Sequence, residues 1–275
     1  MSSNIIKMGP KALQLVSNLA QTGKHVISID DAAYYAESRA RAQQLLSVAV
    51  AQGLLIRLER GVYLIVPLEA GPERKWTEAS FVIANALAKP AAIAYMSAIR
   101  HWNWTEQLPR TVFIQTTQRK SKTKREVLGV TYQFIRVPPR MLFGLKEERI
   151  DSQTFSVTDR EKTLLDCADR PDLAGGMATI FQAVGEAVSQ IDWQILNKYL
   201  ERFQRGAAVK RLMYLLERTN VQDPAFQDIT DYWRGNLTAG VALLDPALPA
   251  KGPIVTRWRI RLNVHGFDRA GNNRT

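Results

Sequence analysis

The sequence predicts an α+β fold in which an N-terminal winged helix-turn-helix precedes a larger mixed α/β domain that is mostly helical. Two short helical segments with a tight turn between them occupy residues 28–53. A two-stranded ribbon follows in residues 54–67, with Glu59, Arg60 and Gly61 at its tip. This is the outline of a module that places one helix in the major groove of DNA and a basic hairpin beside it. Beyond the ribbon, apolar residues recur mainly at helical spacing.

The composition is that of a globular chain with a strong positive charge. Its 275 residues are long enough for two domains, and 46% hydrophobic residues suffice for packed cores. The net charge of +11 attracts anions, which favours nucleic acid or an acidic protein as a partner. Residues 1–16 lack an apolar core of signal-peptide length, and no apolar run reaches about 18 residues. We therefore expect a cytoplasmic protein without a membrane partner.

Three helices are expected before the ribbon, and together with it they define a DNA-binding domain over residues 1–68. The first begins at Pro10, because a first helical turn accepts proline. Ser28 caps the second helix, whose Tyr35 we expect to face inward, and Ser38 caps the third. The third helix has an apolar stripe at helical spacing, formed by Ala42, Leu45, Leu46, Ala49 and Val50.

The opposite face of the third helix is small and polar. Such a face is either solvated or reads DNA, and for this helix alone the two interpretations have similar weight. Arginine and glutamine have the paired donor and acceptor geometry that distinguishes guanine and adenine edges. The candidate base-reading residues are Arg41, Gln43, Gln44 and Ser47.

Basic side chains beside this face suit the DNA backbone. Arg57 and Arg60 lie on the predicted wing, and Arg39 lies at the start of the third helix. Contacts of this kind fix register and add an affinity that falls with salt. We expect these three arginines to bind phosphates.

A linker over residues 69–76 precedes a C-terminal domain over 77–265, and residues 266–275 form a flexible tail. The Thr158-x-x-Glu161 pattern predicts a capping box that opens a helix. Cys167, the single cysteine, falls in the apolar run that follows and is expected to be a small buried residue. Further helices are predicted over residues 77–89, 175–188, 192–203 and 207–218, and strands over 110–118, 129–137 and 256–264.

Two groups of basic residues in this domain form a possible second basic surface. The first group joins two predicted strands and is either a solvated hairpin tip or a contact for nucleic acid or a partner protein. The second alternates along the predicted strand 256–264 and is either its solvent face or an anion-binding ladder. The residues are Arg119, Lys120, Lys122, Lys124 and Arg125 in the first group, and Arg257, Arg259 and Arg261 in the second.

The sequence contains no recognisable catalytic or metal motif. His25, His101 and His265 lie far apart, and no cysteine cluster accompanies them. Gly175 and Gly176 form a glycine pair without a P-loop or dinucleotide-binding pattern. We expect no metal, no cofactor and no enzymatic activity.

Four blocks of the chain resemble the AbiEi family of abortive-infection antitoxins. In chain order they are LLIRLERGVYLIVP, RHWNWTEQLPRTVFIQTT, FSVTDREKTLLDCADRPDLAGG and AAVKRLMYLLER. The similarity extends from about residue 13 to residue 263. Members of this family are regarded as type IV antitoxins and are often described as transcriptional regulators of phage defence.

The resemblance implies an antitoxin that represses its own operon. The winged helix would bind inverted repeats in double-stranded promoter DNA, and the C-terminal domain would carry antitoxicity and assist repression. The partner would be a nucleotidyltransferase toxin, counteracted without a stable complex. Two alternatives stay open: direct sequestration of the toxin through the second basic surface, and an enzymatic C-terminal domain that modifies toxin or RNA.

Overall fold

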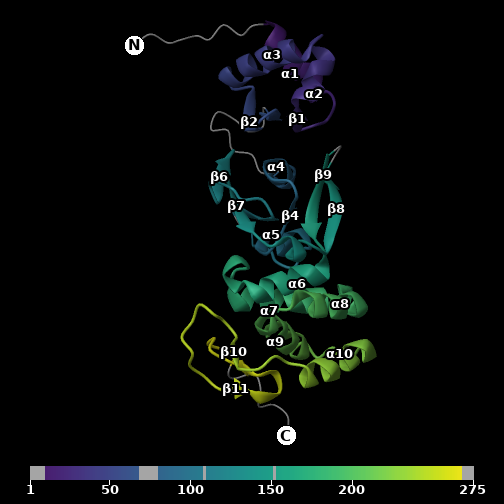
Figure 1. Cartoon of the computed structure of the whole chain (residues 1–275), viewed down its shortest axis with the longest axis vertical. Coiled ribbons are helices and arrows are strands. Elements are labelled where there is room, and N and C mark those ends of the chain that lie inside the picture. Colours follow the sequence, from purple (N-terminus) through teal and green to yellow (C-terminus); the bar gives the residue numbers. More distant parts are fainter. Residues whose placement is uncertain (1–9, 68–79, 108–109, 151–152, 268–275) are drawn as a thin grey trace. The chain divides into compact units, whose positions relative to one another are not determined.

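The computed structural model has a mixed α/β architecture and describes residues 10–67, 80–107, 110–150 and 153–267 (Figure 1). It divides into two compact units. Unit 1 comprises residues 1–93, 110–137 and 147–156, and unit 2 comprises residues 94–109, 138–146 and 157–275. Unit 1 thus joins the predicted N-terminal domain to strands from beyond the predicted boundary at residue 68. The predicted linker and nearly all of the predicted tail lie outside the described residues.

The N-terminal part of unit 1 contains three helices and a small antiparallel sheet. Asp31 and Ser28 form a complete capping box at the second helix, and the Ser38 side chain accepts from the Arg41 amide at the third. Both predicted N-caps are therefore confirmed. The elements are α1 (Pro10–Ala20), β1 (Val26–Ser28), α2 (Ile29–Tyr35), α3 (Arg39–Ala51), β2 (Leu55–Glu59) and β3 (Val62–Ile65), with sheet order β1-β3-β2.

One apolar cluster holds these elements together. Leu15 and Leu19 of α1 pack with Ala42 and Leu46 of α3, and all four side chains are buried. The predicted stripe of α3 is confirmed, since its other members are buried or packed against the same cluster. The inward placement of Tyr35 was wrong, because its side chain is 41% exposed.

A larger sheet, whose strands belong mostly to unit 1, shows that one predicted hairpin was wrong. The predicted strands 110–118 and 129–137 pair in parallel, so they cannot be joined by a hairpin. Part of the joining segment forms another strand, which pairs antiparallel with the second. The sheet has the order β6-β7-β5-β4-β9-β8, with β4 (Ala91–Ile93), β5 (Thr111–Thr116), β6 (Lys124–Val127), β7 (Val130–Arg136), β8 (Leu145–Ile150) and β9 (Gln153–Thr158), and α4 (Ser80–Leu87) precedes it.

Unit 2 is mainly helical. Its helices are α5 (Met96–His101), α6 (Arg160–Asp169), α7 (Gly176–Ala187), α8 (Trp193–Phe203), α9 (Gly206–Glu217) and α10 (Pro224–Gly235), with 3₁₀ turns at Pro139–Met141, Pro171–Leu173 and Val188–Gln190. The predictions for α7, α8 and α9 are confirmed. Helix α9 is buried along most of its length, which is typical of a central helix.

The predicted capping box of Thr158 and Glu161 was wrong, because the helix N-cap lies one residue later. Asp159 is the N-cap of α6, and its carboxylate accepts from the Lys162 amide. Glu161 instead accepts from the amide of Asp192, and the hydroxyl of Thr158 lies 2.7 Å from that of Thr163. Thr158 and Glu161 are both buried, and each takes a partner outside the predicted box.

The predicted strand over residues 256–264 was also wrong. Thr256–Trp258 forms a 3₁₀ turn, and Arg259 adopts a left-handed conformation with φ 48°. This arrangement buries Trp258 completely, with its Nε1 donating to Glu217 over 2.9 Å. Within the predicted range the interruption leaves the short strand β12 (Ile260–Arg261), which pairs with β10 (Ala242–Leu243) and β11 (Ile254–Val255) in a small sheet.

In the described part of the chain, no helix combines the length and apolar character needed to cross a membrane.

Candidate nucleic-acid interface

Helix α3 presents the predicted base-reading residues together on an exposed face. Burial of Ala42, Leu46 and Ala49 fixes the rotation of the helix, because these residues share one helical stripe. The four candidates therefore face solvent: Arg41, Gln43, Gln44 and Ser47 are all exposed.

Two hydrogen bonds order this face. Arg41 donates from Nη1 to Oε1 of Gln44 over 3.1 Å, across one helical turn. Ser47 donates its hydroxyl to the carbonyl of Gln43 over 2.8 Å, which leaves the oxygen lone pairs available as acceptors. Donors of arginine and glutamine and an acceptor of serine thus lie along one side of α3, as hydrogen bonding to base edges requires.

Arg39 lies at the first turn of α3 and forms an ion pair with Asp30 of α2. Both side chains are well exposed, at 64% and 70%. An ion pair in this setting contributes only about 0–1 kcal/mol, so a phosphate can displace the carboxylate at low cost.

The β2–β3 hairpin carries the other predicted phosphate contacts. Its turn contains Arg60 and Gly61, and Gly61 has φ +74°, a backbone conformation that glycine adopts without steric cost. The Gly61 carbonyl accepts from the amide of Ile29 over 2.8 Å, which ties the hairpin to the start of α2. Arg57 and Arg60 are both exposed.

The first predicted basic group does not act as one surface. Arg119, Lys122 and Lys124 are exposed, whereas Lys120 and Arg125 are half-buried against the β2–β3 hairpin. Lys120 lies 3.3 Å from the Glu59 carboxylate, and Arg125 donates to backbone carbonyls of β2.

The second basic group is dispersed, because the strand that was to carry it is interrupted. Arg257 pairs with Glu217 at 2.7 Å. Arg259 donates to the carbonyl of Thr238 over 3.2 Å, and Arg261 donates to that of Gly252 over 3.0 Å. The three arginines therefore bind different parts of unit 2 and do not form a row on one strand face.

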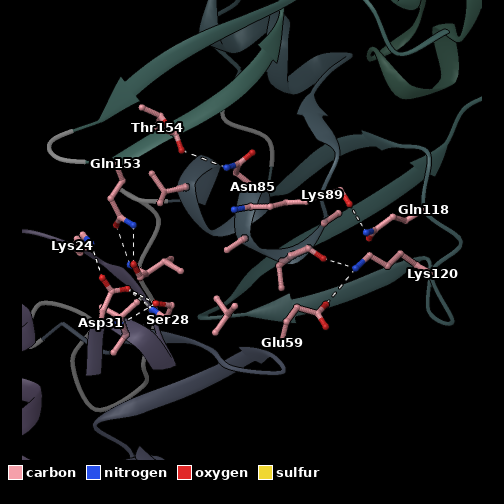
Figure 2. Close-up of a pocket in the computed structure, with 17 residues that line it drawn as sticks. Lys24, Ser28, Asp31, Glu59, Asn85, Lys89, Gln118, Lys120, Gln153 and Thr154 are labelled. Atoms are coloured by element: carbon pink, nitrogen blue, oxygen red, sulfur yellow. Dashed lines mark hydrogen bonds and ion pairs between the residues drawn. The ribbon is translucent and has the colours of Figure 1, made fainter. Parts of the chain in front are cut away.

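A cavity of about 530 Å³ lies in unit 1 beside the β2–β3 hairpin (Figure 2). Its charged lining residues include Lys24, Asp31, Glu59, Lys89 and Lys120. Lys24 pairs with Asp31 at 2.6 Å, and Lys120 pairs with Glu59 at 3.3 Å. Burial raises the pKa of Asp31, but the hydrogen bonds from Lys24 and Ser28 outweigh it, so that the pKa is lowered.

Unit 2 buries a lysine in a place where the sequence suggested only a helix. Lys162 is fully buried, forms an ion pair with Asp166 and lies 5.0 Å from the centre of the Phe143 ring. Cys167 beside it is buried as predicted, and burial raises the pKa of its thiol well above the usual range. A buried, protonated thiol is a poor nucleophile.

Among the described residues, no group of three or more His, Cys, Asp or Glu side chains could hold a metal ion.

Sequence reasoning missed the contacts by which Gln153 and Arg125 hold the small sheet of the candidate interface. Gln153 contacts residues 25 and 26, more than a hundred positions earlier in the chain, and Arg125 contacts β2 from β6. No local pattern could reveal these contacts. The basic residues around Arg125 are apparent in the sequence, but they suggested a solvated hairpin tip or a contact for nucleic acid or a partner protein.

The fold, but not the sequence, resembles a known structure. No family model matches the chain, and no curated protein sequence is significantly similar to it. The crystal structure of the RV2827C protein from Mycobacterium tuberculosis superimposes with a TM-score of 0.63 at 17% identity and covers 91% of each chain. At this level of identity the similarity concerns the fold alone.

Proposed function

We propose that this protein is a sequence-specific DNA-binding repressor, with α1–α3 and β1–β3 forming a winged helix-turn-helix. The observation that carries the proposal is the ordered, exposed face of α3, where Arg41, Gln43, Gln44 and Ser47 are collected next to a helix start that bears Arg39. The hairpin of the same unit adds Arg57 and Arg60. In this assignment α3 reads base edges, and the arginines at 39, 57 and 60 bind phosphates.

The resemblance to AbiEi antitoxins supplies the biological setting of the proposal. The protein would repress its own toxin–antitoxin operon in the cytoplasm by binding inverted repeats in the promoter. It would counteract a nucleotidyltransferase toxin without being an enzyme itself. No cofactor or metal is needed for either role.

Titration of the full chain against its own promoter duplex and a scrambled duplex tests the DNA-binding proposal. Arg41→Ala or Gln44→Ala should cost about 1–3 kcal/mol on the promoter and relax specificity at one base position. Arg60→Ala should weaken both duplexes alike and reduce the salt slope by about one. Equal affinity of the wild-type protein for the two duplexes would refute the proposal.

Antitoxicity requires a separate test. The proposal requires a nucleotidyltransferase toxin gene in the same operon. Co-expression with its product should restore growth, while size-exclusion chromatography of the two proteins should give separate peaks. Co-elution would instead support direct sequestration. Variants Lys122→Glu and Lys124→Glu, at exposed positions of the basic segment, would then show whether that segment makes the contact.

A further inference from the structure

The small sheet of unit 1 has two edge strands, and both edges are occupied by side chains from the large sheet. Within the described residues, the order β1-β3-β2 leaves β1 and β2 each with one side that pairs with no other strand. Edge strands expose N–H and C=O groups that need partners. Gln153 of β9 supplies them on one side, and Arg125 of β6 supplies them on the other.

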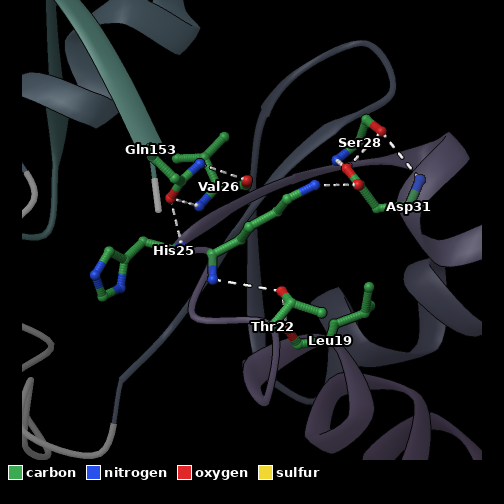
Figure 3. A network of polar contacts seen from close by, with 8 residues as sticks. Leu19, Thr22, His25, Val26, Ser28, Asp31 and Gln153 are labelled. Carbon is green, nitrogen blue, oxygen red and sulfur yellow. Dashed lines mark hydrogen bonds and ion pairs between the residues drawn. The ribbon is translucent and has the colours of Figure 1, made fainter. Parts of the chain in front are cut away.

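Gln153 holds the β1 edge in the way that a neighbouring strand would (Figure 3). Its Oε1 accepts from the amides of His25 and Val26 over 2.5 and 2.9 Å, and its Nε2 donates to the Val26 carbonyl over 2.9 Å. A primary amide carries a donor and an acceptor side by side, as a backbone peptide does. One side chain therefore binds three backbone groups of the edge.

Arg125 holds the β2 edge at an irregular point of the ladder. Arg57 pairs with Tyr63 and Glu59 pairs with Val62, so Leu58 is an extra residue in β2. A bulge of this kind disrupts the local ladder and redirects the strand. Arg125 donates from Nη1 to the Leu58 carbonyl and from Nη2 to the Arg57 carbonyl over 3.0 Å.

The strand that carries Arg125 is itself held in place. Its strand β6 pairs with β7 through a tight turn at Leu128 and Gly129, whose φ angles are 50° and 76°. Arg125 lies opposite Tyr132 in this pairing, and Tyr132 is fully buried. A planar fork on a rigid strand can bind two adjacent carbonyls, a geometry that the lysine ammonium cannot reproduce.

Lys120 adds a third contact to the same hairpin. It donates to the Leu87 carbonyl at the end of α4 and pairs with Glu59 near the hairpin tip (Figure 2). Its ammonium also lies 5.4 Å from the centre of the Phe134 ring. Glu59 is an acidic residue directly before Arg60, and Lys120 balances its charge.

We propose that Gln153, Arg125 and Lys120 are positioning residues that hold the β2–β3 hairpin and β1 in the orientation needed for DNA binding. The inference rests on the proposed function, because it assigns to the hairpin a contact with DNA. Arg125 and Lys120 act through the protein backbone and Glu59 and not through phosphate. In this proposal, side chains of the large sheet position the elements of the small sheet for DNA binding.

Charge-matched variants of the full chain separate positioning from phosphate contact. Arg125→Ala should weaken promoter binding about tenfold, because the hairpin that carries Arg57 and Arg60 loses the contacts that position it. Arg125→Lys keeps the charge but loses the fork, and it should weaken binding as well. Lys124→Ala, the matched control on β6, removes an exposed charge and should change affinity less.

Because Gln153 is uncharged, a variant at this position gives an independent measurement of promoter binding. Gln153→Ala should weaken promoter binding about fivefold, although it changes no charge, because three backbone contacts at β1 are lost. Two results would overturn the proposal: wild-type affinity in Arg125→Lys, or an equal loss of affinity in Arg125→Ala and Lys124→Ala.

Hydrogen exchange without DNA distinguishes failure of this inference from failure of the proposed function. Arg125→Ala should accelerate exchange of the β2–β3 amides about tenfold and leave α6 of unit 2 unchanged. Unchanged exchange in the hairpin would refute the positioning role whatever the DNA data show. A wild-type protein that does not prefer its promoter would refute the proposed function and leave the exchange result intact.

Discussion

At the scale of single residues, one carboxylate of unit 2, that of Glu217, is held by three donors. Glu217 accepts from Arg234 over 2.6 Å, from Arg257 and from the indole of Trp258 over 2.9 Å. Burial alone would raise the pKa of this carboxyl group, but the hydrogen bonds from Arg234, Trp258 and Arg257 lower it. Glu217 is therefore ionised. Its hydrogen bonds connect α9 with α10 and with the C-terminal segment.

Because of these hydrogen bonds, the free energy of unfolding should decrease measurably in acid. Because the pKa of Glu217 is lower in the folded than in the unfolded state, its stabilisation is complete above the unfolded value of about 4.3 and is lost as pH falls through the folded pKa. Glu217→Gln should lower the free energy of unfolding at neutral pH by about 1–3 kcal/mol. The difference from wild type should shrink in acid.

Urea unfolding at neutral and acid pH measures this effect. Glu201→Gln is the control, because it removes one exposed negative charge from α8 and should have little effect on stability. A difference between wild type and Glu217→Gln that stayed constant from neutral to strongly acid pH would contradict the assignment.

At the scale of elements, α3 depends on its cap and on its buried stripe. The Ser38 hydroxyl oxygen accepts from the Arg41 amide over 3.2 Å, at the end of the helix that bears the candidate base-reading residues. The stripe fixes which side of the helix is exposed, and the cap fixes where the helix begins.

Removal of the cap should loosen the start of α3. Ser38→Ala should reduce the free energy of unfolding by about 1 kcal/mol, whereas Ser38→Asp should retain most of it, since aspartate is also a good N-cap. Thermal unfolding of the two variants, with Ser17→Ala on the exposed side of α1 as control, measures the difference. Equal stability of Ser38→Ala and Ser38→Asp would show that the cap contributes little.

Some elements could be predicted because their signals are local. Ser28 and Ser38 cap the residues directly after them, and the apolar spacing of α7, α8 and α9 is contained in each segment. The hairpin turn was predictable from Gly61 for the same reason. In each of these cases, the residues that interact lie within a few positions of one another.

Other elements depended on distant partners and were predicted wrongly. The alternation of residues 256–264 is compatible with a strand, but the burial of Trp258 against Glu217 imposes a turn there. The parallel pairing of β5 with β7 likewise depends on the strand β6 inserted between them in the sequence. Pattern alone cannot show which partner a segment will find.

At the scale of the whole molecule, the net charge of +11 should produce general attraction to DNA in addition to specific reading. Non-specific binding arises almost entirely from counterion release and weakens steeply with salt, whereas base contacts depend on salt much less. The two contributions should therefore respond differently to ionic strength.

The ratio of promoter affinity to scrambled-duplex affinity should rise as salt is increased from about 50 to about 200 mM. Fluorescence anisotropy with both duplexes over this range gives the ratio directly. Arg41→Ala should flatten the rise, because it removes a base contact, while Lys122→Ala at an exposed site should not. A ratio that fell with salt would indicate that binding is general electrostatic attraction.

The sequence by itself determined the helices of the N-terminal segment, the candidate reading face of α3 and the positive charge. Only the tertiary structure decided which basic residues stay available to a partner. Arg125 and Lys120 are used by the β2–β3 hairpin, and the arginines at 257, 259 and 261 are used within unit 2. The physical reason is that helix caps and apolar stripes are formed by neighbours in the chain. The partners of a buried cation or a strand edge are instead distant in the chain and adjacent only in the folded structure.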